Sequence, residues 1–145
     1  MRLSPRFQAV LYAAVAVLFV TGVVWLAVDR AVWPELATDL LRVHGGAAMV
    51  MLVLLGALLP LHARVGWRRG RNVASGIVML GSNALLVLTA FGLYYAGSDT
   101  FRYWTSELHV GLGVALPVLI AGHVIVGRRR RAAARAPRPA VAQGR

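Results

Sequence analysis

The fold is decided by VHGGAAMVMLVLLGALLPLHA, residues 43–63, which contains no Asp, Glu, Lys or Arg. A helix needs about 20 apolar residues to cross a hydrocarbon core of about 30 Å, and this stretch is of that length. Helices in the cores of soluble proteins rarely run so far without a charge. His44 and His62 stand near its two ends. The stretch therefore predicts a transmembrane helix with an imidazole near each of its ends.

Three more uncharged apolar segments occur, over residues 7–28, 73–96 and 108–126. The chain of 145 residues is 59% hydrophobic, well above the ~45–50% of soluble domains. Residues 7–28 have some features of a signal peptide, but the apolar run is too long for an h-region of ~7–15 residues and predicts a retained helix. We expect an all-α transmembrane four-helix bundle over residues 1–127, followed by a basic, disordered tail over 128–145.

The net charge of +11 comes from 16 arginines and five acidic residues, and none of them lies inside an apolar segment. The N-terminus, residues 64–71 and the tail are strongly positive, whereas residues 29–42 and 99–107 are slightly negative. Since positive loops stay in the cytoplasm, this pattern predicts an N-in/C-in multi-pass protein of the bacterial inner membrane. A basic run beside a membrane helix favours contact with anionic membrane lipid over a nucleic-acid partner.

Cysteine is absent from the chain. This excludes disulfides, cysteine-ligated iron–sulfur clusters, thiolate zinc sites and covalently attached c-type haem. Any metal or cofactor must be held by histidine, methionine, asparagine or oxygen ligands.

All four histidines lie in or at the ends of apolar segments, which makes each one a candidate functional residue. His44 and His62 are 18 residues apart, or five turns of an ideal helix, and so share a face. His109 and His123 are 14 residues apart and also share a face. The two helices run in the same direction across the membrane. We therefore expect His44 at the depth of His109, and His62 at the depth of His123.

Two imidazoles that face each other suit a planar macrocycle with iron held from both sides, as in bis-histidine haem b. Two ligands per level leave the tetrahedral shell of zinc half empty, and copper lacks Cys or a well-placed Met. A proton relay through bare histidines is a further alternative, although it more often includes a buried carboxylate. The interpretation is two haems b per chain, with cofactor-binding and iron-ligating residues His44, His62, His109 and His123.

Other residues could support such a site. Pro60 and Pro117 could bend the two histidine helices and accommodate the unequal spacings. Arg42 and Arg64 lie at suitable depths for haem propionates, although arginines at helix ends are more often interfacial anchors. Asn83, the only amide deep in a span, could orient a cofactor or simply bond to a neighbouring helix.

Residues 42–131 resemble the bacterial di-haem b-type cytochromes, small four-helix membrane proteins related to the b subunits of quinone-linked dehydrogenases, hydrogenases and reductases. The resemblance rests on Val43-His44-Gly45, Leu59-Pro60-Leu61-His62, Leu93-Tyr94-Tyr95, Leu108-His109 and Gly122-His123. It implies that the four histidines are axial haem ligands. The 18-residue spacing departs from the family pattern, which the 14-residue spacing follows.

The expected function is electron transfer across the membrane through two bis-histidine haems b, between a quinone or periplasmic redox partner and an inner-face partner. This favours an electron-transfer protein or oxidoreductase subunit over a stand-alone enzyme, and no catalytic residue is assigned. Two alternatives remain: a cofactor-free structural or assembly protein of the membrane, and a membrane oxidoreductase that itself reduces a quinone or a metal ion.

Overall fold

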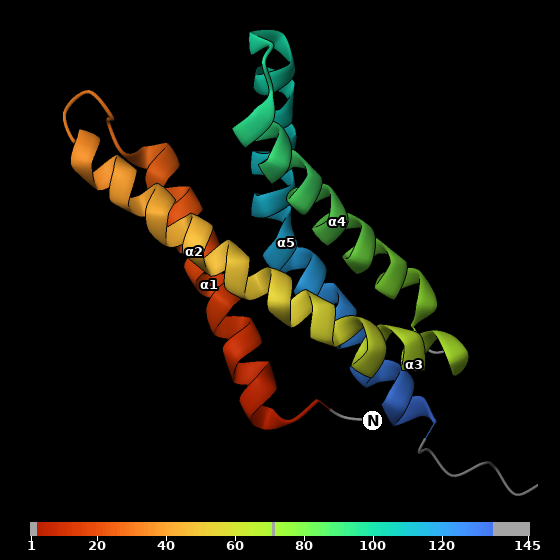
Figure 1. Cartoon of the computed structure of the whole chain (residues 1–145). Helices are drawn as coiled ribbons and strands as arrows, with labels where there is room; N and C mark the ends of the chain where they lie inside the picture. Colours follow the sequence, from red (N-terminus) through yellow and green to blue (C-terminus); the bar gives the residue numbers. More distant parts are fainter. Residues whose placement is uncertain (1–2, 71, 135–145) are drawn as a thin grey trace, which may run out of the picture.

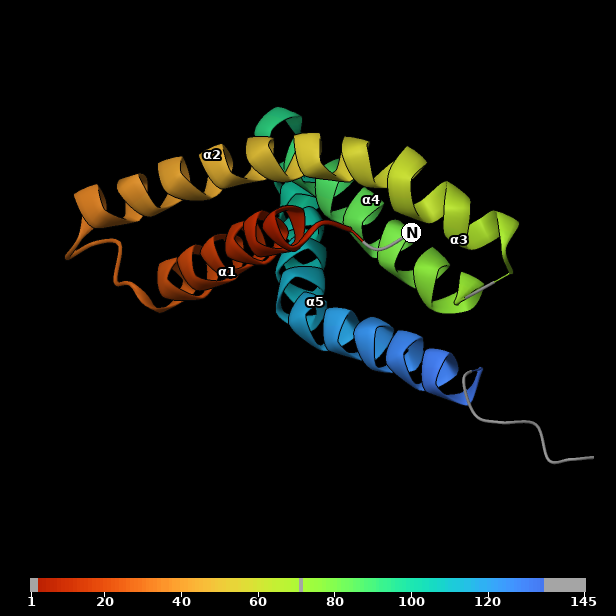
Figure 2. The ribbon, with the colours of Figure 1, turned by 90° about the horizontal axis from the view of Figure 1, so that it is seen from below.

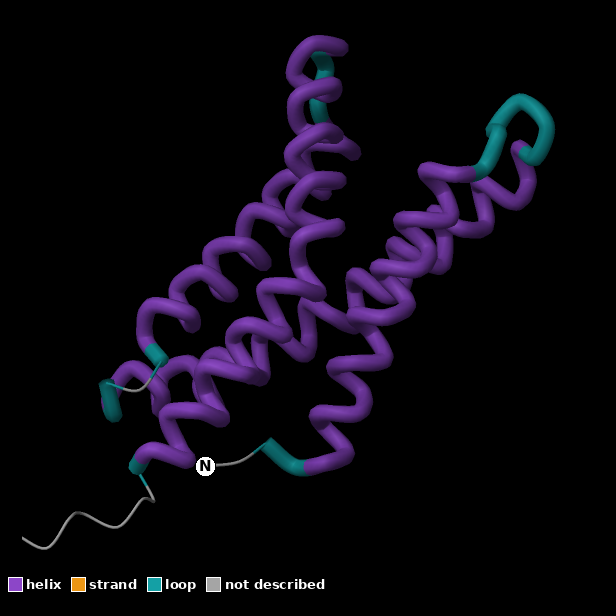
Figure 3. Tube along the Cα trace, turned by 180° about the vertical axis from the view of Figure 1, so that it is seen from behind, coloured by secondary structure: helices purple, strands orange, loops and turns teal. Residues whose placement is uncertain are grey.

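The computed structural model describes residues 3–70 and 72–134, and the regular structure of this part of the chain is entirely helical (Figure 3). The elements are α1 (Pro5–Ala27), α2 (Pro34–Leu58), the π-helix η1 (Leu59–Ala63), α3 (Arg64–Arg68), α4 (Val73–Tyr95) and α5 (Asp99–Ala133). Four helical stretches are long and apolar enough to cross a membrane: Pro5–Ala27, Pro34–Arg68, Val73–Tyr95 and Asp99–Ala133. The predicted all-α transmembrane four-helix architecture is confirmed.

The second and fourth spans are longer than the apolar segments that predict them. α2 begins at Pro34, ahead of the predicted residue 43, and α5 runs from Asp99 to Ala133 where residues 108–126 were expected. The prediction of a disordered tail from residue 128 is therefore wrong for residues 128–133, while residues 135–145 lie outside the described part. Hydropathy marks only the hydrocarbon-embedded portion of a helix, whereas the backbone hydrogen bonding continues into polar sequence.

Local sequence explains where the helices start and turn. The Ser4 hydroxyl accepts a hydrogen bond from the Phe7 N–H at 3.2 Å, and Pro5 occupies the first turn, where its missing N–H costs nothing. Ser98 caps α5 in the same way through the Phe101 N–H at 3.5 Å. Between α3 and α4 the chain reverses through Gly70, with φ of 59°, and Asn72, with φ of 55°. Glycine and asparagine are the residues that best tolerate this left-handed conformation.

The four long helices form two hairpins (Figure 1). α1 packs along α2 and α4 packs along α5, while α1 also touches α5 and α3 touches α4. The α1–α2 and α4–α5 connections lie at one end of the molecule, which we call the loop end. The start of α1, the helix α3 and the end of α5 lie at the other end (Figure 1), which we call the arginine end because Arg64, Arg68, Arg69 and Arg128–Arg131 are exposed there.

Each histidine-bearing span contains a proline, Pro60 in one and Pro117 in the other. Pro60 lies in η1, between α2 and α3, where the hydrogen bonding widens to a π turn. Proline lacks an N–H and its ring crowds the carbonyl four residues earlier, which the wider turn relieves. Pro117 lies inside α5, and Figure 2 shows that α5 bends in its middle. The sequence prediction that these prolines distort the two helices agrees with this course of the chain.

The interior is lined by small and hydroxyl-bearing residues. The buried residues of the helices include Ala14, Ala37, Thr21, Ser82, Thr89 and Thr105, and no large side chain is completely buried in the described part. Large apolar side chains point outward, as Val53 and Val118 do with 74% and 73% of their surface exposed. This is the inverse of a soluble core and is expected where lipid tails cover the outside.

Candidate functional site

The four histidines form two pairs, each of which joins the two hairpins. His44 of α2 faces His109 of α5, with ring centroids 6.3 Å apart and ring planes at 67°. His62 of η1 faces His123 of α5, with centroids 6.1 Å apart and planes at 72°. These are the pairs that the sequence predicts. We call His44 and His109 the loop-end pair, and His62 and His123 the arginine-end pair.

The two pairs have nearly the same separation although their residues are spaced differently along the chain. His44 and His62 are 18 residues apart, and His109 and His123 are 14 apart, a difference of about 6 Å in an ideal helix. The π turn that contains His62 and the bend of α5 lie within these spans (Figure 2). Because a π turn places more residues in each turn, the ideal-helix phase does not extend to His62. The pairing therefore depends on the distortions at the two prolines.

Hydroxyl groups hold both rings of the loop-end pair at Nδ1. Thr21 Oγ1 of α1 lies 2.9 Å from His44 Nδ1, and Thr89 Oγ1 of α4 lies 2.9 Å from His109 Nδ1. Both threonines are buried, each with 7% of its surface exposed. Each histidine is thus held by the helix that packs beside its own in the hairpin, and its ring is oriented toward the opposite hairpin.

In the arginine-end pair, a hydroxyl also holds His123. Ser75 Oγ of α4 lies 3.1 Å from His123 Nδ1, so α4 positions both histidines of α5. Ser75 and Thr89 are 14 residues apart on α4, as are His109 and His123 on α5. Because the two spacings are equal, α4 places one hydroxyl beside each histidine of α5, at two depths in the bundle.

Gly22 and Gly45 lie close to side chains around the loop-end pair, at distances that an added Cβ would tolerate. A Cβ atom added to Gly22, beside Thr21, would lie 3.4 Å from Cε1 of His44. A Cβ added to Gly45 would lie 3.5 Å from the hydroxyl of Tyr94 on α4. α1 and the side chain of Tyr94 therefore both lie beside α2 near His44.

An apolar groove lies between α2 and α4, at a depth between the two histidine pairs. Its volume is about 440 Å³, and its lining residues include Leu52, Gly56, Leu80, Asn83 and Val87. The Asn83 Nδ2 donates a hydrogen bond to the Met79 carbonyl at 2.8 Å, within its own helix. The bond that the structure shows is therefore within α4, and not to a neighbouring helix as one of the two roles considered for Asn83 requires.

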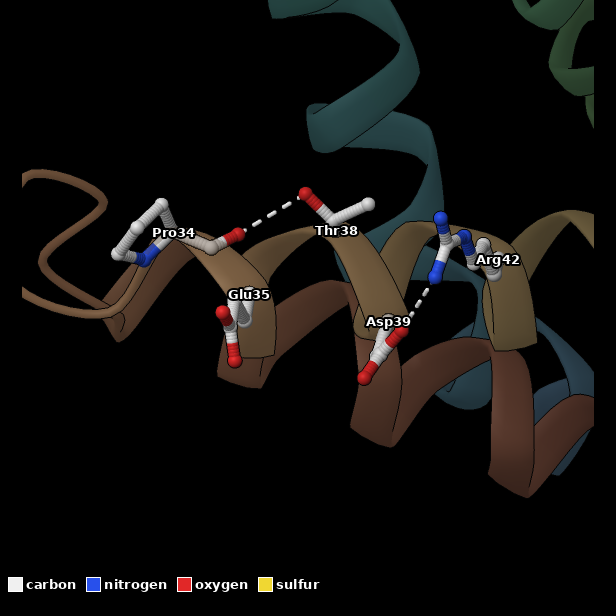
Figure 4. A pocket seen from close by; sticks show the side chains of 5 residues that line it. All are labelled: Pro34, Glu35, Thr38, Asp39 and Arg42. Atoms are coloured by element: carbon white, nitrogen blue, oxygen red, sulfur yellow. Dashed lines mark hydrogen bonds and ion pairs between the residues drawn. The ribbon is translucent and has the colours of Figure 1, made fainter.

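The two arginines considered as propionate partners are exposed. Arg42 lines a shallow polar pocket at the start of α2 together with Asp39 and Thr38 (Figure 4). Its Nη1 donates to Asp39 Oδ1 at 2.9 Å, and both side chains are well exposed, at 75% and 64%. Arg64 is exposed at the start of α3. The Arg42 guanidinium is thus engaged by a carboxylate of its own helix.

A buried donor without a partner lies near the loop end of α1. The indole Nε1 of Trp25, one turn after Thr21, is inaccessible and has no hydrogen-bond partner in the described part of the chain. The Arg30 guanidinium carbon lies 4.6 Å from the centre of the Trp25 ring, a cation–π contact. An unpaired buried N–H costs roughly 1–3 kcal/mol.

Neither histidine pair can complete a metal shell from side chains alone. The described residues contain no group of three or more His, Cys, Asp or Glu side chains that could hold a metal ion. Each pair offers two imidazole nitrogens, whereas zinc takes four ligands. Any ion bound between the rings would need further ligands from a second molecule.

Sequence reasoning missed Thr21, Thr89 and Ser75. A hydroxyl in a membrane helix satisfies itself by bonding to the carbonyl one turn earlier, so its presence in an apolar run is unremarkable. One signal was available for two of them, since Ser75 and Thr89 repeat the 14-residue spacing of His109 and His123.

Comparison of this chain with family profiles, curated proteins and solved structures gives no match.

Proposed function

We propose that the protein is a membrane cytochrome b that carries electrons between the two ends of its bundle through two haems, one held by His44 and His109 and the other by His62 and His123. The observation that carries the proposal is the separation of the rings, 6.3 Å and 6.1 Å between centroids. An imidazole nitrogen binds a metal ion at about 2.0–2.1 Å and lies roughly 1.1 Å from its own ring centre, so two rings that share one ion have centres about 6.3 Å apart. Both pairs have the separation expected of two imidazoles that would hold one metal ion.

The small number of protein ligands supports a macrocycle over a bare ion. A tetrapyrrole supplies four nitrogens in its plane and leaves two axial positions, which is the number of imidazoles at each level. The second pair repeats the arrangement, and together the pairs use every histidine of the chain.

An apolar groove and a buried donor support a large apolar group with acidic substituents. The groove of about 440 Å³ between α2 and α4 has an almost wholly apolar lining and lies between the two pairs, with none of the four histidines in its wall. The unpaired Nε1–H of Trp25 is a donor suited to a carboxylate at the loop end.

Bound haem b supplies reversible one-electron chemistry, with a potential set by its axial ligands, hydrogen bonds and local charge. The chain's own residues would hold two such groups about 21 Å apart along α5, from His109 to His123. That separation covers much of a hydrocarbon core of about 30 Å, so each pair lies toward one end of the bundle. The redox partners at the two ends, a quinone among them, are part of this proposal.

The test is a haem count on the full chain. We expect the protein, expressed in haem-producing cells and purified in detergent, to give the reduced-minus-oxidised spectrum of a b-type cytochrome and about two haems per chain by pyridine haemochrome. A count well below two in fully folded protein contradicts the proposal.

The same spectrum separates the alternative functions. A folded protein with no Soret band indicates a cofactor-free structural or assembly protein. Two haems together with steady reduction of a quinone or a metal ion by the purified chain alone indicate a membrane oxidoreductase.

A further inference from the structure

The hydroxyl groups of Thr21 and Thr89 each have one proton, and the structure shows where it goes. Thr21 Oγ1 lies 2.7 Å from the Val17 carbonyl oxygen, and Thr89 Oγ1 lies 2.7 Å from the Leu85 carbonyl oxygen. Two oxygens approach so closely only with a proton between them, and a carbonyl has none to give. Each threonine therefore donates to its own helix, one turn back.

Because each threonine hydroxyl already donates its only proton to a carbonyl, its oxygen can only accept a hydrogen bond from the imidazole. His44 Nδ1 and His109 Nδ1, each 2.9 Å from a threonine oxygen, must therefore carry hydrogens. A neutral imidazole has only one N–H, so its Nε2 keeps a lone pair. Ser75 repeats the arrangement with longer contacts, 3.2 Å to the Asn72 carbonyl and 3.1 Å to His123 Nδ1.

We infer that Thr21, Thr89 and Ser75 are positioning residues, which lock His44, His109 and His123 in the Nδ1–H tautomer and so present each Nε2 as a ligand before any cofactor binds. The inference rests on the proposed function for its purpose, since a lone pair at Nε2 is what an axial iron ligand needs. Metal-binding histidines commonly donate their other N–H to a partner that sets the tautomer and raises ligand basicity. Here that partner is a hydroxyl oxygen, which can only accept from the imidazole because its own proton is donated to a helix carbonyl.

The first experiment detects the hydrogen bonds themselves. In the full chain labelled with ¹⁵N-histidine, in detergent and reduced with dithionite, three imidazole Nδ1–H protons should be protected from exchange with water. Thr21→Val keeps the shape of the side chain and removes the oxygen, so it should abolish the protection of one of them, and Thr89→Val that of another. Thr21→Ser and Thr89→Ser should restore it. The measurement is valid with or without bound haem, because low-spin ferrous haem is diamagnetic.

The second experiment reads the effect on the cofactor. Thr21→Val and Thr89→Val should each lower the affinity of one haem roughly 10–100-fold, as loss of such partners does at other metal sites. In the chains that keep the loop-end haem, the same variants should raise the reduction potential of that haem. The reason is that an imidazole that donates no hydrogen bond gives less charge to ferric iron. Ser82→Ala and Thr105→Val are the matched controls, since both residues are buried and neither bonds to a histidine.

The outcomes separate this inference from the proposed function. Protected Nδ1–H protons that respond to the valine variants support the inference even in a chain without haem, where only the proposed function fails. Two haems per chain with exchange rates and potentials unchanged in Thr21→Val and Thr89→Val overturn the inference and leave the proposed function standing. Equal changes in Thr105→Val also overturn it, because the effect then follows from disturbing any buried threonine.

Discussion

At the residue scale, the chemistry of this molecule is concentrated in seven side chains, four imidazoles and three hydroxyls. Every imidazole faces another across the two hairpins, and the hydroxyls of Thr21, Thr89 and Ser75 hold three of them from behind. A polar ring in a membrane is costly unless it is satisfied, and the hydroxyls satisfy one nitrogen of His44, His109 and His123.

The pairs predict a specific pattern of non-additivity. If both members of a pair hold one haem, His44→Ala, His109→Ala and the double variant should each lose the same single haem. Either single substitution already abolishes binding of that haem, so the second substitution has no further effect on the haem count. His44→Ala with His62→Ala should lose both. Haem counts by pyridine haemochrome, with a blue-native gel as the check of folding, decide this. A double variant at His44 and His109 that loses more haem than either single variant contradicts the pairing.

At the element scale, the helices owe their courses to prolines and to close contacts between small residues. η1 at Pro60 and the bend of α5 bring histidines with unequal spacings to equal separations. Packing between the hairpin helices depends on small residues, because lipid tails provide no hydrophobic force between the helices.

Restoring a regular helix at Pro60 should affect one site and spare the other. Pro60→Ala gives back the missing N–H and removes the ring clash, so the π turn is expected to relax to an α turn and rotate His62 away from His123. We expect loss of the arginine-end haem, with the loop-end haem retained in spectra and haem counts. Pro34→Ala is the matched control, since Pro34 occupies the first turn of α2, where proline is well tolerated. Retention of both haems in Pro60→Ala would mean that the π turn does not position His62.

The α4–α5 hairpin contains a contact that tolerates no extra atom. A Cβ added to Gly92 would lie 2.8 Å from Cγ2 of Thr105, closer than real Cβ contacts. Gly92→Ala should therefore destabilise the fold by about 1–3 kcal/mol, the usual cost of overpacking. Gly81→Ala on the same helix meets nothing within 4 Å and should cost less. Reversible unfolding in mixed micelles measures both, and Gly92→Ala combined with Thr105→Ala should recover part of the loss.

At the scale of the whole molecule, the two ends carry opposite charge. All five acidic residues and three arginines belong to the stretches 29–42 and 99–107, which lie at the loop end. The other 13 arginines belong to the N-terminal residues, to residues 64–71 and to the sequence from residue 128 onward. The exposed arginines at the end of α5 and in α3 place this charge beside His62 and His123. The two pairs are alike in geometry but lie in different electrostatic environments.

This asymmetry predicts two different reduction potentials. Positive charge stabilises the reduced, less positive state of iron, so the haem of the arginine-end pair should have the higher potential. An equilibrium redox titration should resolve two components, of which His123→Ala removes the higher and His109→Ala the lower. Raising the salt concentration should bring the components together, because it screens the exposed arginines. A higher potential for the component that His109→Ala removes contradicts this assignment.

Much of the fold follows from periodicity and composition alone. Uncharged segments of about 20 residues have few ways to be satisfied in a bilayer other than as helices, so four spans could be recognised without any structure. The ends of α2 and α5 could not, because Pro34–Arg42 and Arg128–Ala133 are helical yet polar.

The histidine pairs were predicted from helical spacing, but part of that argument fails. It treats residues 44–62 as a uniform helix, whereas η1 interrupts it and the meeting of His62 with His123 depends on the π turn. The role of Thr21 had no such signal, since a hydroxyl that bonds to its own helix fits any span. For Ser75 and Thr89 the one signal was their 14-residue spacing, which matches that of His109 and His123.

By itself, the sequence determined that four helices cross a membrane, that any cofactor must be held without cysteine, and that two histidines lie on each of two spans. These properties depend on residue type and local spacing. The tertiary structure decided which helix packs against which, how far apart the facing rings lie and which hydroxyl accepts from which imidazole. Those properties depend on contacts between residues 20 to 65 positions apart, where a turn or a bend of a few degrees moves a side chain by several ångströms.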